Sequence, residues 1–241
     1  MAKLYILYIV FIIFVIYIKL FKPIICYQMK SYHKLYYWKP ELLGQEIWAF
    51  DKLDGQNLRF EANFKRGFYK FGSRTQMISD KDEQFGIGVN LFMEKYSEPL
   101  MSIFSKKWGK DRFANFTVFA ELVGENSFAG RHDVNDKLDV ILFDVWIYKK
   151  GWVQPQKFID EFGHLGIPNL IYQGELDNQI ITDIQENKYN LKEGVIAKGI
   201  EDKDVFMCKI KTKSWLTRVK TELGEKALLE DIDGNKKHLI V

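Results

Sequence analysis

Apolar and polar residues alternate along the chain beyond residue 29 in patterns that predict both strands and helices. Leu58, Phe60, Ala62 and Phe64 are separated by polar residues, a period of two that is typical of a strand with one buried face. Further strands are predicted at Phe116–Val123, Val140–Tyr148, Gly194–Gly199 and Val205–Lys211. Helices are predicted at Glu83–Phe104, at Pro155–Leu165 with its proline in the first turn, and at Ser214–Leu229. Strands separated by unequal loops, with helices at intervals, predict an α+β domain.

A hydrophobic leader precedes this domain. The run from Leu4 to Ile18 is wholly apolar or aromatic, and it reaches Phe21 if Lys19 is passed over. A spanning helix needs about 20 residues, and the leader lacks the small-residue cleavage site of a secretory signal. Two interpretations stay open for residues 1–28: a membrane anchor, whose flanking lysines would keep the bulk of the chain cytoplasmic, or an extension upstream of a true start at Met29. We expect residues 29–241 to form one domain with a cytoplasmic location.

The net charge of +3 belongs to the leader. The chain has 35 basic and 32 acidic residues, and Lys3, Lys19 and Lys22 lie in the leader, so 35 − 3 = 32 basic residues face 32 acids in the remainder. Any nucleic acid must therefore be held by local patches rather than by a net positive field. The candidate patches are Lys65, Arg66, Lys70 and Arg74; Lys106, Lys107, Lys110 and Arg112; and Lys213, Arg218 and Lys220.

Several familiar site types are excluded by the sequence. With two cysteines the chain has no disulfide framework and no Cys-rich zinc site. Its four histidines are scattered without ligand spacing. No phosphate-binding loop of the G-x-x-x-x-G-K-[ST] type occurs, and Gly86-Ile-Gly88 lacks the third glycine of a dinucleotide-binding turn.

One short motif begins an ordered series. In Lys52-Leu53-Asp54-Gly55-Gln56-Asn57 a lysine ends an apolar stretch and Asp-Gly turns the chain into the next strand. A lysine beside such a turn is usually only solvated, so the motif gains weight from the segments that come after it in the chain. In order these segments are Ser73-Arg74, Phe119-Ala120-Glu121-Leu122-Val123-Gly124, Leu142-Phe143-Asp144-Val145, Glu193-Gly194-Val195-Ile196-Ala197-Lys198 and Lys209-Ile210-Lys211.

This series resembles the covalent nucleotidyltransferase superfamily of ATP-dependent DNA and RNA ligases and mRNA capping enzymes, over about Trp48 to Trp215. The resemblance implies antiparallel sheets flanked by helices, with the nucleotide in the cleft between them. It also implies that Lys52 attacks the α-phosphate of the nucleotide and holds the nucleoside monophosphate as a phosphoramidate.

Two features favour the RNA ligase 2-like branch of that superfamily. Asn57 stands five positions after the nucleophile, where DNA ligases typically have arginine. Only 30 residues follow Lys211, too few for the OB-fold domain that DNA ligases and capping enzymes carry there. We therefore expect an ATP-dependent RNA ligase domain without an OB domain.

The resemblance also implies individual roles. Glu121 would accept hydrogen bonds from the ribose hydroxyls, and a carboxylate in the middle of an apolar strand is costly unless it has such a partner. Phe143 would stack on adenine, although a core position is a strong alternative. Glu193 would orient Mg²⁺ or Mn²⁺. Lys198 would lie near the phosphates, and Arg74 would bind the adenylate phosphate or the 5′-phosphate of the RNA.

Residues beside the nucleophile complete the predicted nucleotide-binding set, namely Asp51, Leu53 and Asn57. Asp51 occupies the position where many RNA ligases carry an adenine-contacting glutamate, so the adenine contact stays open.

Two further lysines are expected to activate the nucleophile. Lys209 and Lys211 are two residues apart on a predicted strand and so share one face. Both ammonium groups would point into the site, where together with Mg²⁺ they would lower the pKa of Lys52. A solvated strand face is the alternative.

The expected reaction has three steps: adenylylation of Lys52, transfer of AMP to an RNA 5′-phosphate, and sealing to a 3′-OH with release of AMP. A separate protein could recognise the ends, and a loop with Gly130, Arg131 and His132 could close over the ligand or be an ordinary surface loop. The alternatives are a DNA ligase or guanylyltransferase domain that works with a separate OB protein, and a membrane-tethered nucleic-acid-binding domain without catalysis.

Overall fold

A computed structural model describes residues 29–111, 114–124 and 136–233, the last four without their side chains. The chain divides into two units, residues 1–30 and Ser31–Val241, and the sheets and helices lie in the second. Within the described residues, no helix is both long and apolar enough to cross a membrane. The leader at 1–28 and the loop at 130–132 lie outside the described residues, so their interpretations stay predictions.

One sheet has six antiparallel strands and carries the larger core. Its strands lie in the order β5-β4-β3-β6-β7-β8 and span, in chain order, β3 Gln56–Asn63, β4 Gly67–Ser73, β5 Met77–Ile78, β6 Asn115–Val123, β7 Asp139–Ile147 and β8 Gly151–Trp152. The helices α2 (Gly86–Trp108) and α3 (Pro155–Phe162) contribute to the core on one face, and a short 3₁₀ turn at Gly163–Leu165 (η2) follows α3. Stacked Phe60 and Phe92 join sheet and helix, with ring centroids 3.5 Å apart.

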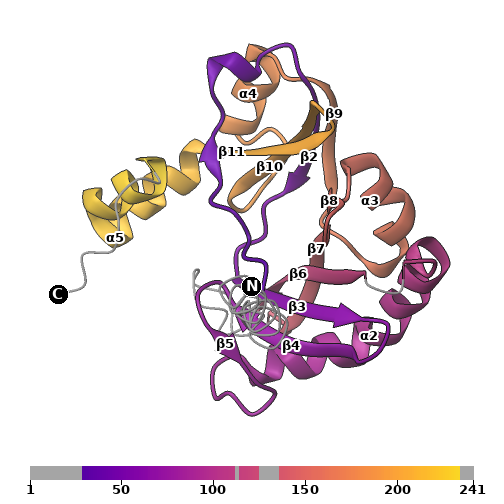
Figure 1. Cartoon of the computed structure of the whole chain (residues 1–241). Coiled ribbons are helices and arrows are strands. Elements are labelled where there is room, and N and C mark those ends of the chain that lie inside the picture. The colour runs from indigo at the N-terminus through magenta and orange to yellow at the C-terminus, as the bar shows by residue number, and fades with distance from the viewer. Residues whose placement is uncertain (1–28, 112–113, 125–135, 234–241) are drawn as a thin grey trace, which may run out of the picture. The chain divides into compact units, whose positions relative to one another are not determined.

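The other sheet has five strands in the order β1-β11-β10-β2-β9 (Figure 1). They are β1 Tyr36–Tyr37, β2 Glu46–Asp51, β9 Leu170–Glu175, β10 Gly194–Glu201 and β11 Asp204–Lys211. β1 runs parallel to β11, and the other pairs are antiparallel. The helix α4 (Asn178–Gln185) packs on this sheet around a second, smaller core, and Pro40–Leu42 forms a 3₁₀ turn (η1). The helix α5 (Lys213–Asp233), yellow in Figure 1, follows β11 and is kinked at Gly224.

Each sheet buries one face in its own core and leaves the alternate residues for the opposite face. On β6, Val118 and Ala120 lie in the larger core while Glu121 lies between core positions. On β11, Cys208 and Ile210 lie in the smaller core, whereas Lys209 and Lys211 point the other way, as predicted. Because side chains alternate along a strand, the polar residues of both sheets are excluded from the cores.

The structure confirms the α+β class and the predicted strands to within two residues at each end. Helix α2 begins three residues later and ends four residues later than predicted, with Pro99 inside it. The sequence prediction gave no range for β1, β2, β4, β5, β8 and β9, and it missed α4. β9 is largely exposed or half-buried and contains Gly174, and α4 is only eight residues long, so neither has a strong hydrophobic period.

The close approach of α2 to the six-stranded sheet depends on Gly88. Packing thus accounts for the second glycine of Gly86-Ile-Gly88, which does not match a dinucleotide-binding turn. A Cβ atom at Gly88 would lie 2.6 Å from Leu58 Cδ1 and 3.2 Å from Leu122 Cδ2.

Gly88→Ala should therefore overpack this contact and lower the free energy of unfolding by about 1–3 kcal/mol, measured by urea denaturation. Gly163→Ala is the matched control: its Cβ would have no heavy atom nearer than 3.9 Å, at a helical φ of −54°. The control should be neutral or slightly stabilising. Equal losses in both variants would contradict the packing argument.

Candidate active site

The segment that carries Lys52 joins the two sheets, because β2 ends at Asp51 and β3 begins at Gln56. The Lys52 N–H donates to the Gly194 carbonyl of β10 over 2.9 Å. Gly55 packs against β6 so closely that a Cβ atom would lie 2.2 Å from the Leu122 carbonyl oxygen. The lysine is thus held between a strand of one sheet and a strand of the other.

A cavity of about 200 Å³ opens beside Lys52. The structure brings all the predicted site residues to it: Asp51, Lys52, Leu53, Asn57, Arg74, Glu121, Phe143, Glu193, Lys198, Lys209 and Lys211. Five of these side chains are cationic and three are carboxylates, so the lining favours an anionic ligand.

Glu193 bridges two lysines of the cavity. Its Oε2 lies 2.8 Å from Lys52 Nζ and its Oε1 lies 2.7 Å from Lys211 Nζ. A carboxylate partner favours the protonated form of an amine. The predicted activation of Lys52 by neighbouring cations stays a prediction, and the structure adds a carboxylate, Glu193, as a direct partner of the Lys52 amine.

The two lysines of β11 are buried, and the ammonium group of each lies over an aromatic ring. The Lys211 ammonium lies 5.2 Å from the ring centroid of Trp215. The Lys209 ammonium lies 4.8 Å from that of Tyr37. Aromatic faces attract cations, so the rings hold both side chains in place although little of either is exposed.

Glu121 is fully buried in the cavity wall. Burial is the main cause that raises the pKa of this carboxyl to about 8; Glu193 and Asp54 add to the rise, while Lys52 and Arg74 oppose it. Glu121 is thus largely protonated at pH 7 in this form of the protein.

A β-bulge in β7 determines how Phe143 enters the cavity. Phe119 of β6 pairs with Asp144, but the next residue, Ala120, pairs with Leu142, so Phe143 is the extra residue. The core positions of β7 accordingly run Val140, Leu142, Val145 and Ile147. Both Phe143 and Asp144 leave the core face, which removes the core alternative for Phe143.

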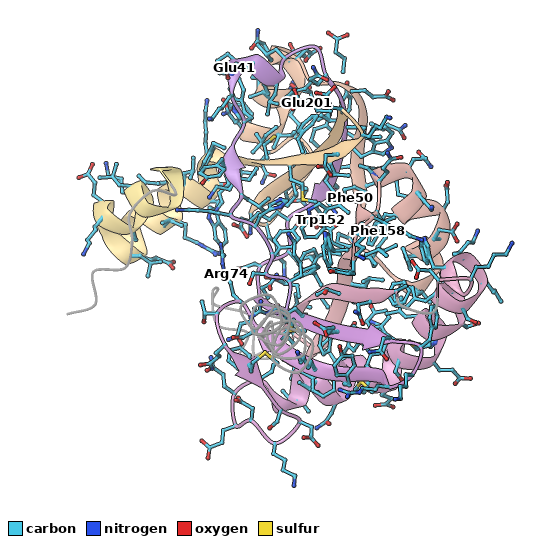
Figure 2. All side chains as sticks on the ribbon, viewed as in Figure 1. Glu41, Phe50, Arg74, Trp152, Phe158 and Glu201 are labelled. Carbon is cyan, nitrogen blue, oxygen red and sulfur yellow. The ribbon has the colours of Figure 1, made fainter. Side chains whose placement is uncertain are left out.

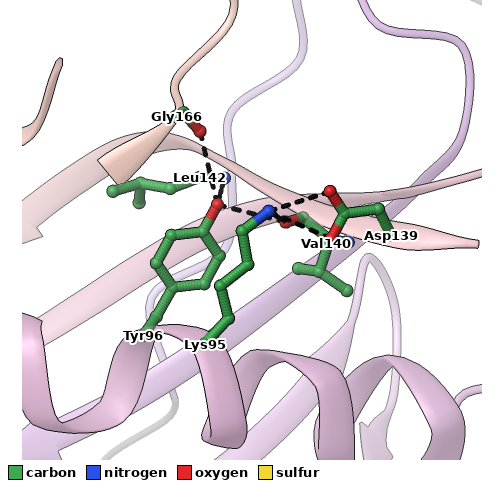
Figure 3. Close-up of polar contacts among 6 residues, drawn as sticks. All are labelled: Lys95, Tyr96, Asp139, Val140, Leu142 and Gly166. Atoms are coloured by element: carbon green, nitrogen blue, oxygen red, sulfur yellow. Dashed lines mark hydrogen bonds and ion pairs between the residues drawn. The ribbon is translucent and has the colours of Figure 1, made fainter. Parts of the chain in front are cut away.

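The strand is held beside the bulge by Tyr96 of α2, as Figure 3 shows. The Tyr96 hydroxyl accepts a hydrogen bond from the Leu142 N–H (3.3 Å) and lies 3.1 Å from the Val140 carbonyl oxygen, to which it can donate. It also reaches the Gly166 carbonyl at 3.3 Å. A hydroxyl from the larger core thus supports the strand where its ladder is irregular.

Asp144 is a site residue to which the sequence motifs assigned no role. Its Oδ1 lies 2.8 Å from Lys198 Nζ, and its Oδ2 accepts a 2.6 Å hydrogen bond from the Tyr32 hydroxyl. Lys198 also donates to the Phe143 carbonyl (2.9 Å). The resemblance implied a phosphate contact for Lys198, whereas here its ammonium ties β10 to β7 across the cleft.

Lys198 lies over two aromatic rings. Its Nζ is 5.0 Å from the ring centroid of Phe50 and 5.1 Å from that of Phe158, both labelled in Figure 2. The same figure labels Arg74, an exposed side chain that lines the cavity from the segment after β4. The cavity thus has one end with Lys52, Glu193 and Lys211 and another end that is aromatic.

Two buried oxygens of the cavity lining have no hydrogen-bond partner among the described residues: Asp51 Oδ1 and Asn57 Oδ1. Burial, followed by the charge of Glu193, raises the pKa of the Asp51 carboxyl. Unpaired buried acceptors are costly, so both are suited to receive donor groups of a bound ligand.

Comparison with known proteins identifies the family. A family model described as RNA ligase matches residues 45–213. The chain belongs to the RNA ligase family. The matched range contains every predicted site residue, from Asp51 to Lys211. No curated protein sequence matches the chain significantly.

Solved structures of Naegleria gruberi RNA ligase are similar in fold. An aspartate-to-alanine variant in the apo form has a TM-score of 0.61 at 15% identity, covering 80% of this chain and 58% of that chain. A lysine-to-alanine variant with ATP and Mn has a TM-score of 0.59 at 16% identity, covering 79% and 58%. The chain thus spans less than two thirds of the length of these structures. The predicted nucleotidyltransferase fold is confirmed.

The cavity of this RNA ligase family member includes residues that the sequence motifs did not predict, among them Tyr32, Leu35 and Phe50. Tyr32 and Leu35 precede the recognisable motifs, and only the tertiary fold brings them to the cleft. The bulge had no clear signal either, because every residue of Val140–Ile147 except Asp144 is apolar.

The predicted basic patches of the family member differ in their surroundings. Lys107 pairs with Glu161, and Lys213 with Glu186. Arg218 of the last patch lies 3.7 Å from Asp54, two residues after Lys52. Arg74 of the first patch lines the cavity together with Lys52, and Arg112 of the second patch lies outside the described residues.

Glu121→Gln should change how stability depends on pH. Between pH 4.5 and about 8 the folded protein keeps a proton on Glu121 that the unfolded chain releases, so the free energy of unfolding falls as pH rises through that window. Glutamine does not titrate, so the variant lacks this fall in the free energy of unfolding. The Tm of the variant relative to wild type should rise from about pH 5 to pH 8 and level off above it, by an amount equivalent to a few kcal/mol.

Glu222→Gln, on the exposed surface of α5, is the control and should show no such change relative to wild type. Parallel pH profiles for Glu121→Gln and wild type would contradict the raised pKa.

Proposed function

We propose that this chain is the catalytic domain of an ATP-dependent RNA ligase. The observation that carries the proposal is the Lys52–Glu193 pair, 2.8 Å apart in a predominantly cationic cavity of an RNA ligase family chain. The substrates are ATP and RNA with 5′-phosphate and 3′-OH ends. A cytoplasmic location and a separate end-recognition partner belong to the same proposal and rest on the sequence alone.

The cavity has a suitable group for each part of ATP. Phe143 and Ile196 line it from different sheets and can hold the base between them. Asp51 Oδ1 is a free acceptor for an exocyclic amine, which adenine carries at its pairing edge. Glu121 faces the ribose, and Lys209, Lys211 and Arg74 supply charge for the phosphates.

Glu193 is the group that fits a divalent metal. Within the described residues there is no cluster of three or more His, Cys, Asp or Glu side chains, so most ligands would come from water and ATP phosphates, as is usual for Mg²⁺. Bound metal would neutralise phosphate charge. Glu193 would then give up its ion pair with Lys52, which can lose its proton and attack.

The proposed reaction consists of three displacements at phosphorus, each of which forms one bond and breaks another. Lys52 Nζ forms a bond to the α-phosphorus while the bond to pyrophosphate breaks, and the amine proton passes to solvent. The RNA 5′-phosphate then displaces Lys52 from the AMP. The 3′-hydroxyl finally attacks that 5′-phosphate, AMP leaves, and one phosphodiester has formed.

A groove of about 640 Å³ offers a place for the RNA end. It shares Lys52, Arg74 and Lys211 with the nucleotide cavity and is bounded on another side by α5. Trp215 lines it with a buried Nε1 that has no hydrogen-bond partner among the described residues, and the Arg218 guanidinium lies 4.2 Å from the Trp215 ring centroid. A donor and a guanidinium beside Lys52 suit a phosphate.

Incubation with α-labelled ATP and Mg²⁺ should yield protein-linked label that acid releases. Lys52→Ala should abolish the label, because no other group can form the phosphoramidate at this position. Lys188→Ala is the control: this lysine pairs with Asp183 on the surface and should label as wild type does.

Label that persists in Lys52→Ala would contradict the assignment. Preference for GTP, or for nicked DNA over RNA ends, would favour the guanylyltransferase or DNA ligase alternatives. Nucleic acid binding without any label at several Mg²⁺ concentrations would favour a non-catalytic domain.

A further inference from the structure

The segment Ser31–Trp38 precedes the range matched by the RNA ligase family, which begins at residue 45, yet it forms part of the nucleotide cavity. β1 pairs with β11 through Tyr36 opposite Cys208, and the Trp38 N–H donates to the Lys209 carbonyl (3.2 Å). This pairing fixes the segment along the edge of the five-stranded sheet. Tyr32, His33 and Leu35 then line the cavity.

The hydroxyl of the half-buried Tyr32 is a hydrogen-bond donor at the aromatic end of the cavity. It lies 2.6 Å from Asp144 Oδ2 and 3.1 Å from Met207 Sδ. Burial, and then the nearby Asp144 charge, raise the pKa of the Tyr32 phenol well above its ordinary value. The phenol therefore stays protonated and donates to the carboxylate that holds Lys198.

The Tyr32 ring contacts the side chain proposed to stack on the base. It meets Phe143 nearly at right angles (centroids 5.1 Å apart, 87°) and Phe119 at the same distance and 62°. Edge-to-face contacts of this kind are favourable. Tyr32 thus restrains Phe143 by its ring and the Asp144–Lys198 pair by its hydroxyl.

We propose that Tyr32 is a positioning residue for the base-binding end of the cavity, acting through Asp144 and Phe143 to set the affinity for ATP. The proposal rests on the proposed function for the identity of the ligand. Tyr32 lines the cavity and does not fill the place of the ligand, since a volume of about 200 Å³ lined by all the predicted site residues remains beside it.

The test measures ATP affinity apart from chemistry, in the full chain. The Kd for ATP is determined by calorimetry without divalent metal, and the ATP dependence of Lys52 adenylylation is determined with Mg²⁺. A hydrogen bond to a charged group is worth about 1.5–3 kcal/mol. Because the Tyr32–Asp144 bond is also made without ATP, only part of this energy affects binding, and Tyr32→Phe should weaken Kd and raise KM about threefold to tenfold. The maximal rate should change less than about twofold, because Lys52 and Glu193 are untouched.

Tyr32→Ala, which also removes the ring, should weaken binding further. Tyr172→Phe is the matched control: its hydroxyl donates to the Glu175 carbonyl (2.9 Å) and the residue does not line the cavity, so its Kd should equal that of wild type.

An unchanged Kd in Tyr32→Phe with a lowered Tm would reduce Tyr32 to a structural role, and a tighter Kd would mean that Tyr32 competes with ATP; either result overturns the proposal. Wild-type protein that binds ATP but never forms the lysyl adduct would refute the proposed function, while the Kd comparison still decides the role of Tyr32. Wild-type protein that binds no ATP would refute both.

Discussion

The carboxylate of Glu193 stands between two ammonium groups, and the site depends on that arrangement. With only 3% of Glu193 exposed, water screens the three charges weakly, so each holds the others in place. Lys52 is thereby aimed into the cavity with its amine in contact with a carboxylate. In the proposed reaction this ion pair must open before Lys52 can attack, so reactivity depends on what next engages Glu193.

The opposite end of the cavity is ordered by different means. There the Asp144–Lys198 pair crosses from β7 to β10 and is surrounded by aromatic rings, including those of Phe50 and Phe158. A buried pair of this kind adds little to stability by comparison with apolar packing, but it has a definite geometry. We interpret it as a specific polar contact that links two sheets with separate cores.

The division into two cores explains why the cleft between the sheets is not closed by apolar packing. Each sheet satisfies its hydrophobic face with its own helices, α2 and α3 for one and α4 for the other. The facing sides are then free to carry charges such as Lys209 and Glu121. Residues 52–55 connect the sheets, so Lys52 lies where the two halves meet.

The sequence by itself determined the α+β class, five of the eleven described strands and a set of candidate residues that the structure brings to one cavity, because alternation along a strand specifies which side chains avoid the core. It also placed Lys209 and Lys211 on one face. Tertiary structure alone decided that Glu193 pairs with Lys52, that a bulge turns both Phe143 and Asp144 into the cleft, and that Tyr32 reaches Asp144 from a distance of 112 positions along the chain. Alternation is a local property of the backbone, whereas these contacts depend on how two sheets with separate cores come together.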